Sequence, residues 1–181
     1  MVKPLNNPSS VPFAIVTRKN GYSVVDHPGS VAVIPVLNHD SSVLPRRTDD
    51  SLILLCSQNR AGPEANVIEI PAGTCDVTNE ILSETGIREM EEEVGYSPSH
   101  YTYLGNMLPS PGYCSEVIHL YLAWGLIECK GEREFEPIVM SVGNVLGQIS
   151  AGSIIDAKTI VALTMWQLLE VKIMGKLEII R

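Results

Sequence analysis

Residues 69–96 read EIPAGTCDVTNEILSETGIREMEEEVGY and combine a strand end, a turn and a helix. The alternating apolar pattern before this turn predicts a strand over residues 66–73, which ends at a proline and a glycine. Residues 79–94 then predict the first helix, which stops at Gly95. Positions 88–93 of that helix hold one arginine and four glutamates. Such a concentration of like charge indicates either a solvated acidic face or a bound counter-ion.

The helical period sorts these glutamates into two sets. At about 100° per residue, Glu89, Glu92 and Glu93 share an arc of roughly 100°, whereas Glu91 falls on the opposite side and is expected to face solvent. Three converging carboxylates repel one another, and a hard cation such as Mg²⁺ would turn that repulsion into attraction. A surface helix with an acidic excess is the alternative.

The other faces of the helix have separate expected roles. Arg88 lies beside the acidic arc, where paired hydrogen bonds could hold a glutamate. The stripe expected to anchor the helix to the core consists of Ile87, Met90 and Val94.

Outside this stretch the chain predicts mainly strands, followed by two closing helices. A hairpin is expected around Asn20-Gly21, and Ser141 and Asp156 are expected to cap helices that run to Ile149 and to about Met174. The further predicted strands are 30–37, 51–60, 101–108, 117–128 and 137–142. This order predicts a mixed α/β (α+β) sandwich rather than a doubly wound parallel sheet.

Composition excludes some classes of function. The chain has 181 residues, of which 21 are acidic and 13 basic, and its net charge is −8. Because no Lys/Arg-rich run offsets this charge, the sequence argues against a nucleic-acid-binding protein. An acidic protein can still bind an anionic small molecule when a metal cation lies between them.

Several patterns bear on the compartment. The four cysteines show no C-x-x-C spacing, and residues 1–10 lack the pattern of a signal peptide. The apolar stretch 159–174 contains Gln167, Glu170 and Lys172, so we expect a docked helix rather than a membrane span. We therefore expect a cytoplasmic protein with reduced thiols.

The stretch quoted above resembles the Nudix box, whose pattern is Gly, five residues, Glu, seven residues, Arg-Glu, and then Glu-Glu and Gly at fixed steps. Glu80, the following seven residues and the run from Arg88 to Tyr96 fit this pattern fully. Six residues rather than five lie between Gly73 and Glu80, because the segment TCDVTN carries one extra residue. We interpret this as a lengthened loop in front of an unchanged helix.

The resemblance implies a Nudix-like α/β/α sandwich with a mixed central sheet plus an N-terminal antiparallel sheet. It also implies a Mg²⁺- or Mn²⁺-dependent hydrolase of nucleoside diphosphate derivatives. By position, Arg88 would orient the carboxylates, and Glu80 would brace the loop and helix. The metal ligands by position would be Glu89, Glu92, Glu93 and the backbone oxygen of Ala72.

Segments outside the box are similar to the ADP-ribose pyrophosphatase branch of the family. They include VDHPGSVAVIPV, QNR, SPGYCSEVIHLYLA and GSIIDAKTIVAL, and Pro111 lies sixteen residues after Gly95, as the marker proline of that branch would. Arg60, a cation at a strand end close in sequence to the box, suits a diphosphate, and an ordinary surface arginine is the alternative. Glu116, on a loop, could accept hydrogen bonds from the terminal ribose hydroxyls. Glu69 either meets the nucleoside or satisfies its own strand.

The working base is expected in the segment EREFEP. The resemblance implies Glu134, on a loop, as the residue that activates the attacking water, with Glu132 and Glu136 as alternatives. Together with Arg88 and Glu93, Glu134 forms the expected catalytic set.

The expected reaction converts ADP-ribose to AMP and ribose 5-phosphate. The alternatives are hydrolysis of a nucleotide sugar or dinucleotide, and a Nudix module that binds nucleotide without cleaving it. Residues 1–28 are expected to form N-terminal strands that pair in a homodimer, and residues 29–181 the Nudix domain.

Overall fold

The computed structural model describes residues 15–39 and 41–178. Seven segments form a mixed sheet in which β5, β4, β3, β8 and β7 lie side by side, while β6 pairs with β3 and β9 with β4. The strands are β1 (Ile15–Lys19), β2 (Tyr22–Asp26), β3 (Ser30–Val36), β4 (Leu52–Arg60), β5 (Ala65–Glu69), β6 (Ala72–Thr74), β7 (Tyr96–Met107), β8 (Ile118–Glu128) and β9 (Ile138–Ser141). The helices are α1 (Leu82–Val94), α2 (Val142–Ser150) and α3 (Ala157–Glu178).

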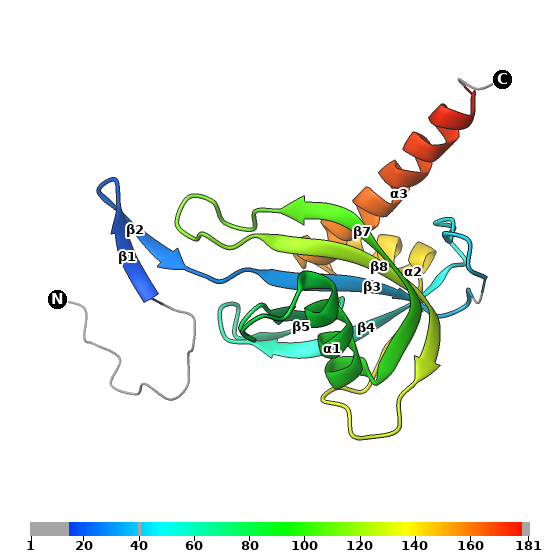
Figure 1. Cartoon of the computed structure of the whole chain (residues 1–181), viewed down its shortest axis with the longest axis horizontal. Coiled ribbons are helices and arrows are strands. Elements are labelled where there is room, and N and C mark those ends of the chain that lie inside the picture. Colours follow the sequence, from blue (N-terminus) through cyan, green and yellow to red (C-terminus); the bar gives the residue numbers. More distant parts are fainter. Residues whose placement is uncertain (1–14, 40, 179–181) are drawn as a thin grey trace.

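The central pair β3–β8 is parallel and its neighbours are antiparallel, so the sheet is mixed as predicted. Strand β3 is buried along its whole length, because both faces of the sheet are covered. Its alternate residues divide between two cores. Val31 and Val33 pack with Met90 on the α1 side, whereas Ala32 and Ile34 pack on the side of α2 and α3. Figure 1 shows α1 in front of the sheet, and the register therefore produces the predicted α/β/α sandwich.

The predicted hairpin is also present. Strands β1 and β2 pair antiparallel around Asn20 and Gly21, both of which have positive φ. The hairpin projects from the main sheet (Figure 1) and is attached through β2 to the loop between β7 and β8. There the Val25 N–H donates to the Tyr113 carbonyl at 2.7 Å, and the Ser115 N–H donates to the Val25 carbonyl at 3.0 Å.

The two closing helices begin where the sequence predicts. The Ser141 Oγ accepts the N–H of Asn144 at 3.3 Å, and the Asp156 Oδ2 accepts the N–H of Thr159 at 2.9 Å. Both side chains are therefore N-caps. Helix α3 runs four residues beyond the predicted end at Met174.

Three predicted boundaries were wrong, each for a local reason. The strand expected over 66–73 is two strands, β5 and β6, since Pro71 breaks the ladder between them. Helix α1 starts at Leu82 rather than 79, because Asn79 takes a φ of 68° and the chain turns before the helix. Strand β7 starts directly after the left-handed C-cap Gly95 rather than at residue 101.

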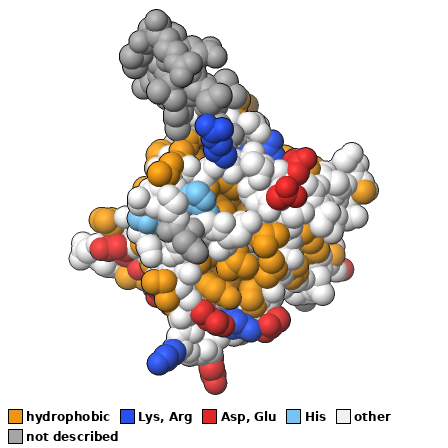
Figure 2. Space-filling model, turned by 90° about the vertical axis from the view of Figure 1, so that its right-hand side faces the viewer, with side chains coloured by type: hydrophobic (Ala, Val, Ile, Leu, Met, Phe, Trp, Pro, Cys, Tyr) orange, Lys and Arg blue, Asp and Glu red, His pale blue; other side chains and the backbone are white. Residues whose placement is uncertain are grey.

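The surface on the right-hand side of Figure 1 gathers hydrophobic side chains near its middle, with charged side chains toward its margins (Figure 2). All four cysteines are free thiols. Within the described residues, no helix is both long and apolar enough to cross a membrane.

Candidate active site

A cleft of about 330 Å³ opens where several elements meet. The start of β3 contributes Ser30, the end of β4 contributes Arg60, and all three residues of β6 line the cleft. The loop before β8 adds Glu116, and the start of α3 adds Lys158. Arg60, Glu116 and Ala72, which the sequence predicts as site residues, therefore lie around one cavity.

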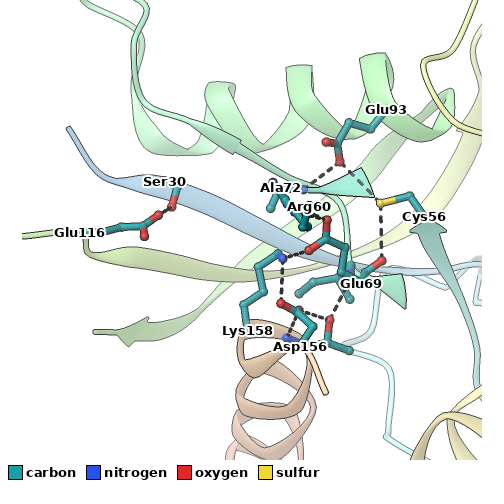
Figure 3. Close-up of polar contacts among 11 residues, drawn as sticks. Ser30, Cys56, Arg60, Glu69, Ala72, Glu93, Glu116, Asp156 and Lys158 are labelled. Carbon is teal, nitrogen blue, oxygen red and sulfur yellow. Dashed lines mark hydrogen bonds and ion pairs between the residues drawn. The ribbon is translucent and has the colours of Figure 1, made fainter. Parts of the chain in front are cut away.

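Helix α1 presents Glu93 to the strand that lines this cleft. The Glu93 side chain is buried, and its Oε2 accepts the N–H of Ala72 at 2.9 Å (Figure 3). The Cys56 thiol lies 4.0 Å from the same oxygen. Burial, opposed by the Ala72 hydrogen bond and reinforced by the nearby carboxylates of Glu89, Glu69 and Glu134, raises the pKa of Glu93 to about 7. Glu93 is thus poised to change its charge near neutral pH.

Glu89 lies against the same strand, one residue further along. A Cβ at Gly73 would lie 1.8 Å from the Cδ of Glu89, so only glycine leaves room for this side chain. Burial raises the pKa of Glu89, partly offset by its hydrogen bond with Arg88. The acidic face of α1 is therefore packed directly onto β6.

The Arg88 cluster comprises Arg88, Glu89 and Glu92 of α1 and Glu80, which lies just before the helix. Arg88 donates from Nε and Nη2 to the two carboxylate oxygens of Glu80 at 2.9 and 3.1 Å. Its Nη1 donates to Glu89 at 2.7 Å and to Glu92 at 3.0 Å. The hydrogen bonds to Glu80 raise the pKa of Arg88 and lower that of Glu80. These contacts agree with the expected roles of Arg88 in orienting carboxylates and of Glu80 in bracing the loop.

The helical sorting of the glutamates is visible in these contacts. Glu89 and Glu93 face β6, and Glu92 joins Arg88 with a side chain that is 57% exposed. Glu91 is half-buried rather than fully solvent-facing, and lies near Cys129. Of the expected core stripe, Met90 and Val94 are fully buried, but Ile87 is only half-buried.

The chemistry of this donor set suits a hard divalent cation, because Glu89, Glu92 and Glu93 offer carboxylate oxygens from adjacent turns of one helix. In the conformation described, Arg88 takes one oxygen of Glu89 and one of Glu92, and the Ala72 N–H takes one oxygen of Glu93. Among residues 15–39 and 41–178, no three His, Cys, Asp or Glu side chains are already grouped around one point. Cation binding would therefore require these glutamates to turn toward one ion.

A second set of charges, the Arg60 cluster, lies in the cleft and consists of Arg60, Glu69, Asp156 and Lys158 (Figure 3). The Glu69 carboxylate is 2% exposed and contacts Arg60 through Oε1, at 2.6 Å from Nη2, and Lys158 through Oε2. Lys158 also donates to Asp156 Oδ1 at 3.0 Å. Of the two roles considered for Glu69, these contacts favour the internal one, since both oxygens already have protein partners.

The cluster is tied to the backbone through Thr159. Its hydroxyl donates to Asp156 Oδ2 at 2.6 Å and accepts the N–H of Ile70 at 3.0 Å. The start of α3 is thereby fixed to the end of β5, although the two segments are far apart in the sequence.

Glu116 lies across the cleft from this cluster. Its Oε1 accepts the Ser30 hydroxyl at 2.6 Å. His27 Nδ1 is 3.8 Å from the same oxygen and accepts the N–H of Gly29 at 3.1 Å. The Ser30 hydrogen bond fixes one oxygen of Glu116 in a wall of the cleft.

The two remaining predicted residues, Glu134 and Pro111, both lie on loops. Glu134 is exposed, but its backbone N–H donates to the Glu92 carbonyl at 2.8 Å, which holds the loop at the end of α1. Of the alternatives to Glu134, Glu136 forms an ion pair with Arg133 at 2.7 Å. Pro111 is exposed on the loop before β8, and it is Pro109 that lines the cleft.

Sequence reasoning missed Lys158, Ser30 and His27 as cleft residues. Lys158 sits two positions after a predicted helix cap, and the only available signal was that a lysine in the first turn of a helix opposes the helix dipole unless a carboxylate is near. Ser30 and His27 carried no signal, because serine and histidine near a strand start are common.

The chain is similar to known proteins over most of its length. A family model described as a NUDIX domain matches residues 27–144. The chain is 34% identical over 153 residues to a methanol dehydrogenase activator of Bacillus methanolicus and 32% identical over 153 residues to an ADP-ribose pyrophosphatase of Bacillus subtilis strain 168. Each alignment covers 81% of this chain and 76% of the relative.

A further relative and a solved structure extend these matches. An ADP-ribose pyrophosphatase of Mycobacterium tuberculosis H37Rv is 33% identical over 130 residues, which cover 71% of this chain and 56% of the relative. A crystal structure of an ADP compounds hydrolase matches with a TM-score of 0.63 and 19% identity, covering 86% of this chain and 78% of that one. This last likeness confirms the predicted fold.

Proposed function

The chain belongs to the Nudix family and is a Nudix hydrolase, and from this premise we propose that it hydrolyses the diphosphate of ADP-ribose with the help of a divalent cation. The predicted resemblance to the ADP-ribose pyrophosphatase branch is confirmed by the two relatives of that name. The proposal concerns the substrate, the cation and the roles of individual residues.

One observation carries the proposal: the acidic face of α1 closes on a strand that lines a cleft containing cationic side chains. Glu93 lies 2.9 Å from the Ala72 N–H, and Glu89 fills the space over Gly73. Ala72 and Gly73 line the cleft together with Arg60. A diphosphate in this cleft would lie between the carboxylates of α1 and the guanidinium of Arg60.

The carboxylates that would hold the cation are those of Glu89, Glu92 and Glu93, with the carbonyl of Ala72. Mg²⁺ or Mn²⁺, when bound, supplies positive charge to the phosphate oxygens and orients the diphosphate. Arg88 keeps two of these carboxylates in place before binding, as its hydrogen bonds to Glu89 and Glu92 suggest.

In the reaction, the oxygen of a water molecule forms a bond to one phosphorus while the bridging P–O bond breaks. One proton of the water passes to the base, for which we propose Glu134, and the bridging oxygen leaves with the second phosphate. ADP-ribose and water thus give AMP and ribose 5-phosphate. Glu134 is exposed on a loop whose backbone is fixed to Glu92 and Glu93, so it lies at the end of α1 where the acidic face is.

The sugar-binding side of the proposal rests on Glu116. Its Oε1 accepts a hydrogen bond from Ser30, and its other oxygen can accept hydrogen bonds from the hydroxyl groups of a ribose in the cleft. Pro111 stays a predicted marker of the branch, on the same loop.

A panel of nucleoside diphosphate compounds tests this proposal. ADP-ribose, a nucleotide sugar and a dinucleotide are each incubated with the protein and Mg²⁺ or Mn²⁺, and in parallel with EDTA. We expect ADP-ribose to give the highest kcat/KM and EDTA to abolish turnover. Preference for a nucleotide sugar or dinucleotide would correct the substrate, and binding without turnover of any compound would support a non-catalytic module instead.

We also propose that the protein is a homodimer that acts in the cytoplasm, with residues 1–28 contributing to the pairing and 29–181 forming the catalytic domain. The β1–β2 hairpin projects from the sheet (Figure 1) and exposes Val16 and Tyr22, which are 65% and 72% exposed. Exposed apolar side chains on a projecting hairpin suit a protein partner. Light scattering on the full chain distinguishes dimer from monomer.

A further inference from the structure

We propose that Lys158 is a positioning residue of the cleft: it fixes Glu69, and Glu69 in turn aims the guanidinium of Arg60 at the anionic group of the substrate. The identity of that anion as a diphosphate rests on the proposed function. The positioning itself rests on contacts within the chain.

Glu69 is held by one cation on each carboxylate oxygen. Oε1 accepts from Arg60 Nε at 2.9 Å, and Oε2 accepts from Lys158 Nζ (Figure 3). Among the described residues, Lys158 is the hydrogen-bond partner of Oε2. Because the carboxylate is 2% exposed, water does not readily replace a lost partner. Removing Lys158 would therefore free Glu69 to rotate.

Lys158 is itself fixed from a second direction. Its Nζ donates to Asp156 Oδ1 at 3.0 Å, and Asp156 is bonded on its other oxygen by Thr159. Thr159 is fully buried and also bonds the Ile70 backbone, one residue after Glu69. Lys158 and Glu69 thus belong to one rigid unit formed by the start of α3 and the end of β5.

Exposure decides which of the two cations meets a ligand. The Lys158 side chain is 9% exposed, whereas that of Arg60 is 41% exposed. Arg60 uses Nε and Nη2 on Glu69, which is one edge of its planar fork. A guanidinium has five N–H donors, and those of Nη1 have no hydrogen-bond partner within the described part of the chain. Arg60 can therefore keep Glu69 and bind a phosphate through its other edge.

The charges of the cluster balance only when Lys158 is present. Arg60 and Lys158 carry two positive charges against the two negative charges of Glu69 and Asp156. Without Lys158 the wall of the cleft would carry a formal charge of −1 beside the binding position of an anion. Loss of the lysine would weaken anion binding both by misdirecting Arg60 and by repulsion.

Steady-state kinetics with ADP-ribose and Mg²⁺ test the inference on five proteins: wild type, Lys158→Met, Lys158→Arg, Arg60→Ala and the double variant Lys158→Met/Arg60→Ala. We expect Lys158→Met to raise KM about 10–100-fold, the range typical for loss of an outer supporting contact, with kcat changed by less than about 3-fold. Lys158→Arg keeps the charge and should restore most of the affinity. The exposed lysine Lys130, changed to Met, is the matched control and should leave KM unaltered.

The KM of the double variant, compared with those of the two single variants, distinguishes a positioning role of Lys158 from a merely structural one. If Lys158 acts through Arg60, Lys158→Met should raise KM by less than about 3-fold once Arg60 is already Ala. Full multiplication of the two single effects would overturn the inference, and so would an unchanged KM in folded Lys158→Met. Because that variant leaves two carboxylates facing each other, Glu69→Gln is measured beside it. Glu69→Gln keeps Lys158 paired with Asp156 and should reproduce the rise in KM, and an unchanged KM in this variant also contradicts the inference.

A binding experiment keeps the inference separate from the proposed function. Absence of ADP-ribose turnover by the wild type would overturn the proposed function alone. Calorimetric titration with inorganic diphosphate then decides the inference, with about 10-fold weaker binding expected for Lys158→Met and for Arg60→Ala than for wild type. Equal affinity of wild type and Lys158→Met for diphosphate would overturn it.

Discussion

The Arg88 cluster and the Arg60 cluster both balance carboxylates with cations, but in opposite arrangements. In the first, one arginine of α1 joins three glutamates, all within 13 residues of the chain. In the second, a single buried glutamate at the end of β5 joins two cations, one from β4 and one from α3. The partners of Glu69 are 9 and 89 residues away.

This difference has a functional meaning. The Arg88 cluster leaves an excess of negative charge beside β6, which suits a cation, whereas the Arg60 cluster is neutral and offers the free edge of a guanidinium, which suits an anion. Ala72 and Gly73 lie between them and line the cleft. A cation-bound diphosphate needs both kinds of surface, one on each side.

The largest expected difference between the two clusters is in stability, when one carboxylate is removed from each. Glu69→Gln breaks a buried ion pair and should lower the free energy of unfolding by about 3 kcal/mol, because Oε2 no longer neutralises Lys158. Glu80→Gln should have a much smaller effect, since Arg88 keeps Glu89 and Glu92 as partners. Urea denaturation of the three proteins measures both changes. Equal losses in the two variants would show that burial does not distinguish the clusters.

The free energy of unfolding should also depend on pH, because of Glu93 on α1. The pKa of Glu93 is raised to about 7 by burial, from an ordinary value of 4.5. Below pH 4.5 both the folded and the unfolded chain hold this proton. Between pH 4.5 and about 7 the folded chain holds a proton that the unfolded chain has released, so the free energy of unfolding falls as pH rises, by up to about 3 kcal/mol in total.

Denaturation in EDTA between pH 4.5 and 8 measures this slope, and Glu93→Gln should remove most of it. Glu116→Gln, on the wall of the cleft opposite the Arg60 cluster, is the control and should leave the slope unchanged. The same slope in Glu93→Gln as in wild type would place the titrating group elsewhere.

The smallest expected effect concerns the contact between the acidic face and β6. Gly73→Ala should displace Glu89, because the new Cβ would overlap the end of that flexible side chain. We expect kcat/KM to fall about 10–100-fold with little change in the urea midpoint. Gly112→Ala, where a Cβ would meet nothing within 4 Å, is the matched control. Full activity of Gly73→Ala would mean that Glu89 need not lie against β6.

The Arg88 cluster was predictable because Arg88, Glu89 and Glu92 lie on one helix and Glu80 lies just before it. A period of 100° per residue was enough to separate Glu89, Glu92 and Glu93 from Glu91 and to place Arg88 beside them. The capping residues Ser141 and Asp156 and the alternating strands were equally local signals. Where the local signal failed, as at Asn79, a single positive φ shifted the start of the helix.

The Arg60 cluster was only half predictable. Arg60 and Glu69 belong to paired strands, and a role for each could be considered from the sequence. Lys158 could not be paired with Glu69, because only the packing of α3 on the end of β5 brings the two together. Contacts across 89 residues depend on tertiary packing, to which hydrophobic periodicity gives no guide.

The most direct test of the central claim is the turnover of ADP-ribose with Mg²⁺ by wild type, Glu93→Gln and Glu91→Gln. Both variants lose one carboxylate from α1, but of the two residues only Glu93 bonds β6, the strand that lines the cleft. The account predicts release of AMP and ribose 5-phosphate by wild type, a loss of at least about 100-fold in kcat for Glu93→Gln, and near-normal kcat for Glu91→Gln. Equal turnover by wild type and Glu93→Gln would contradict it.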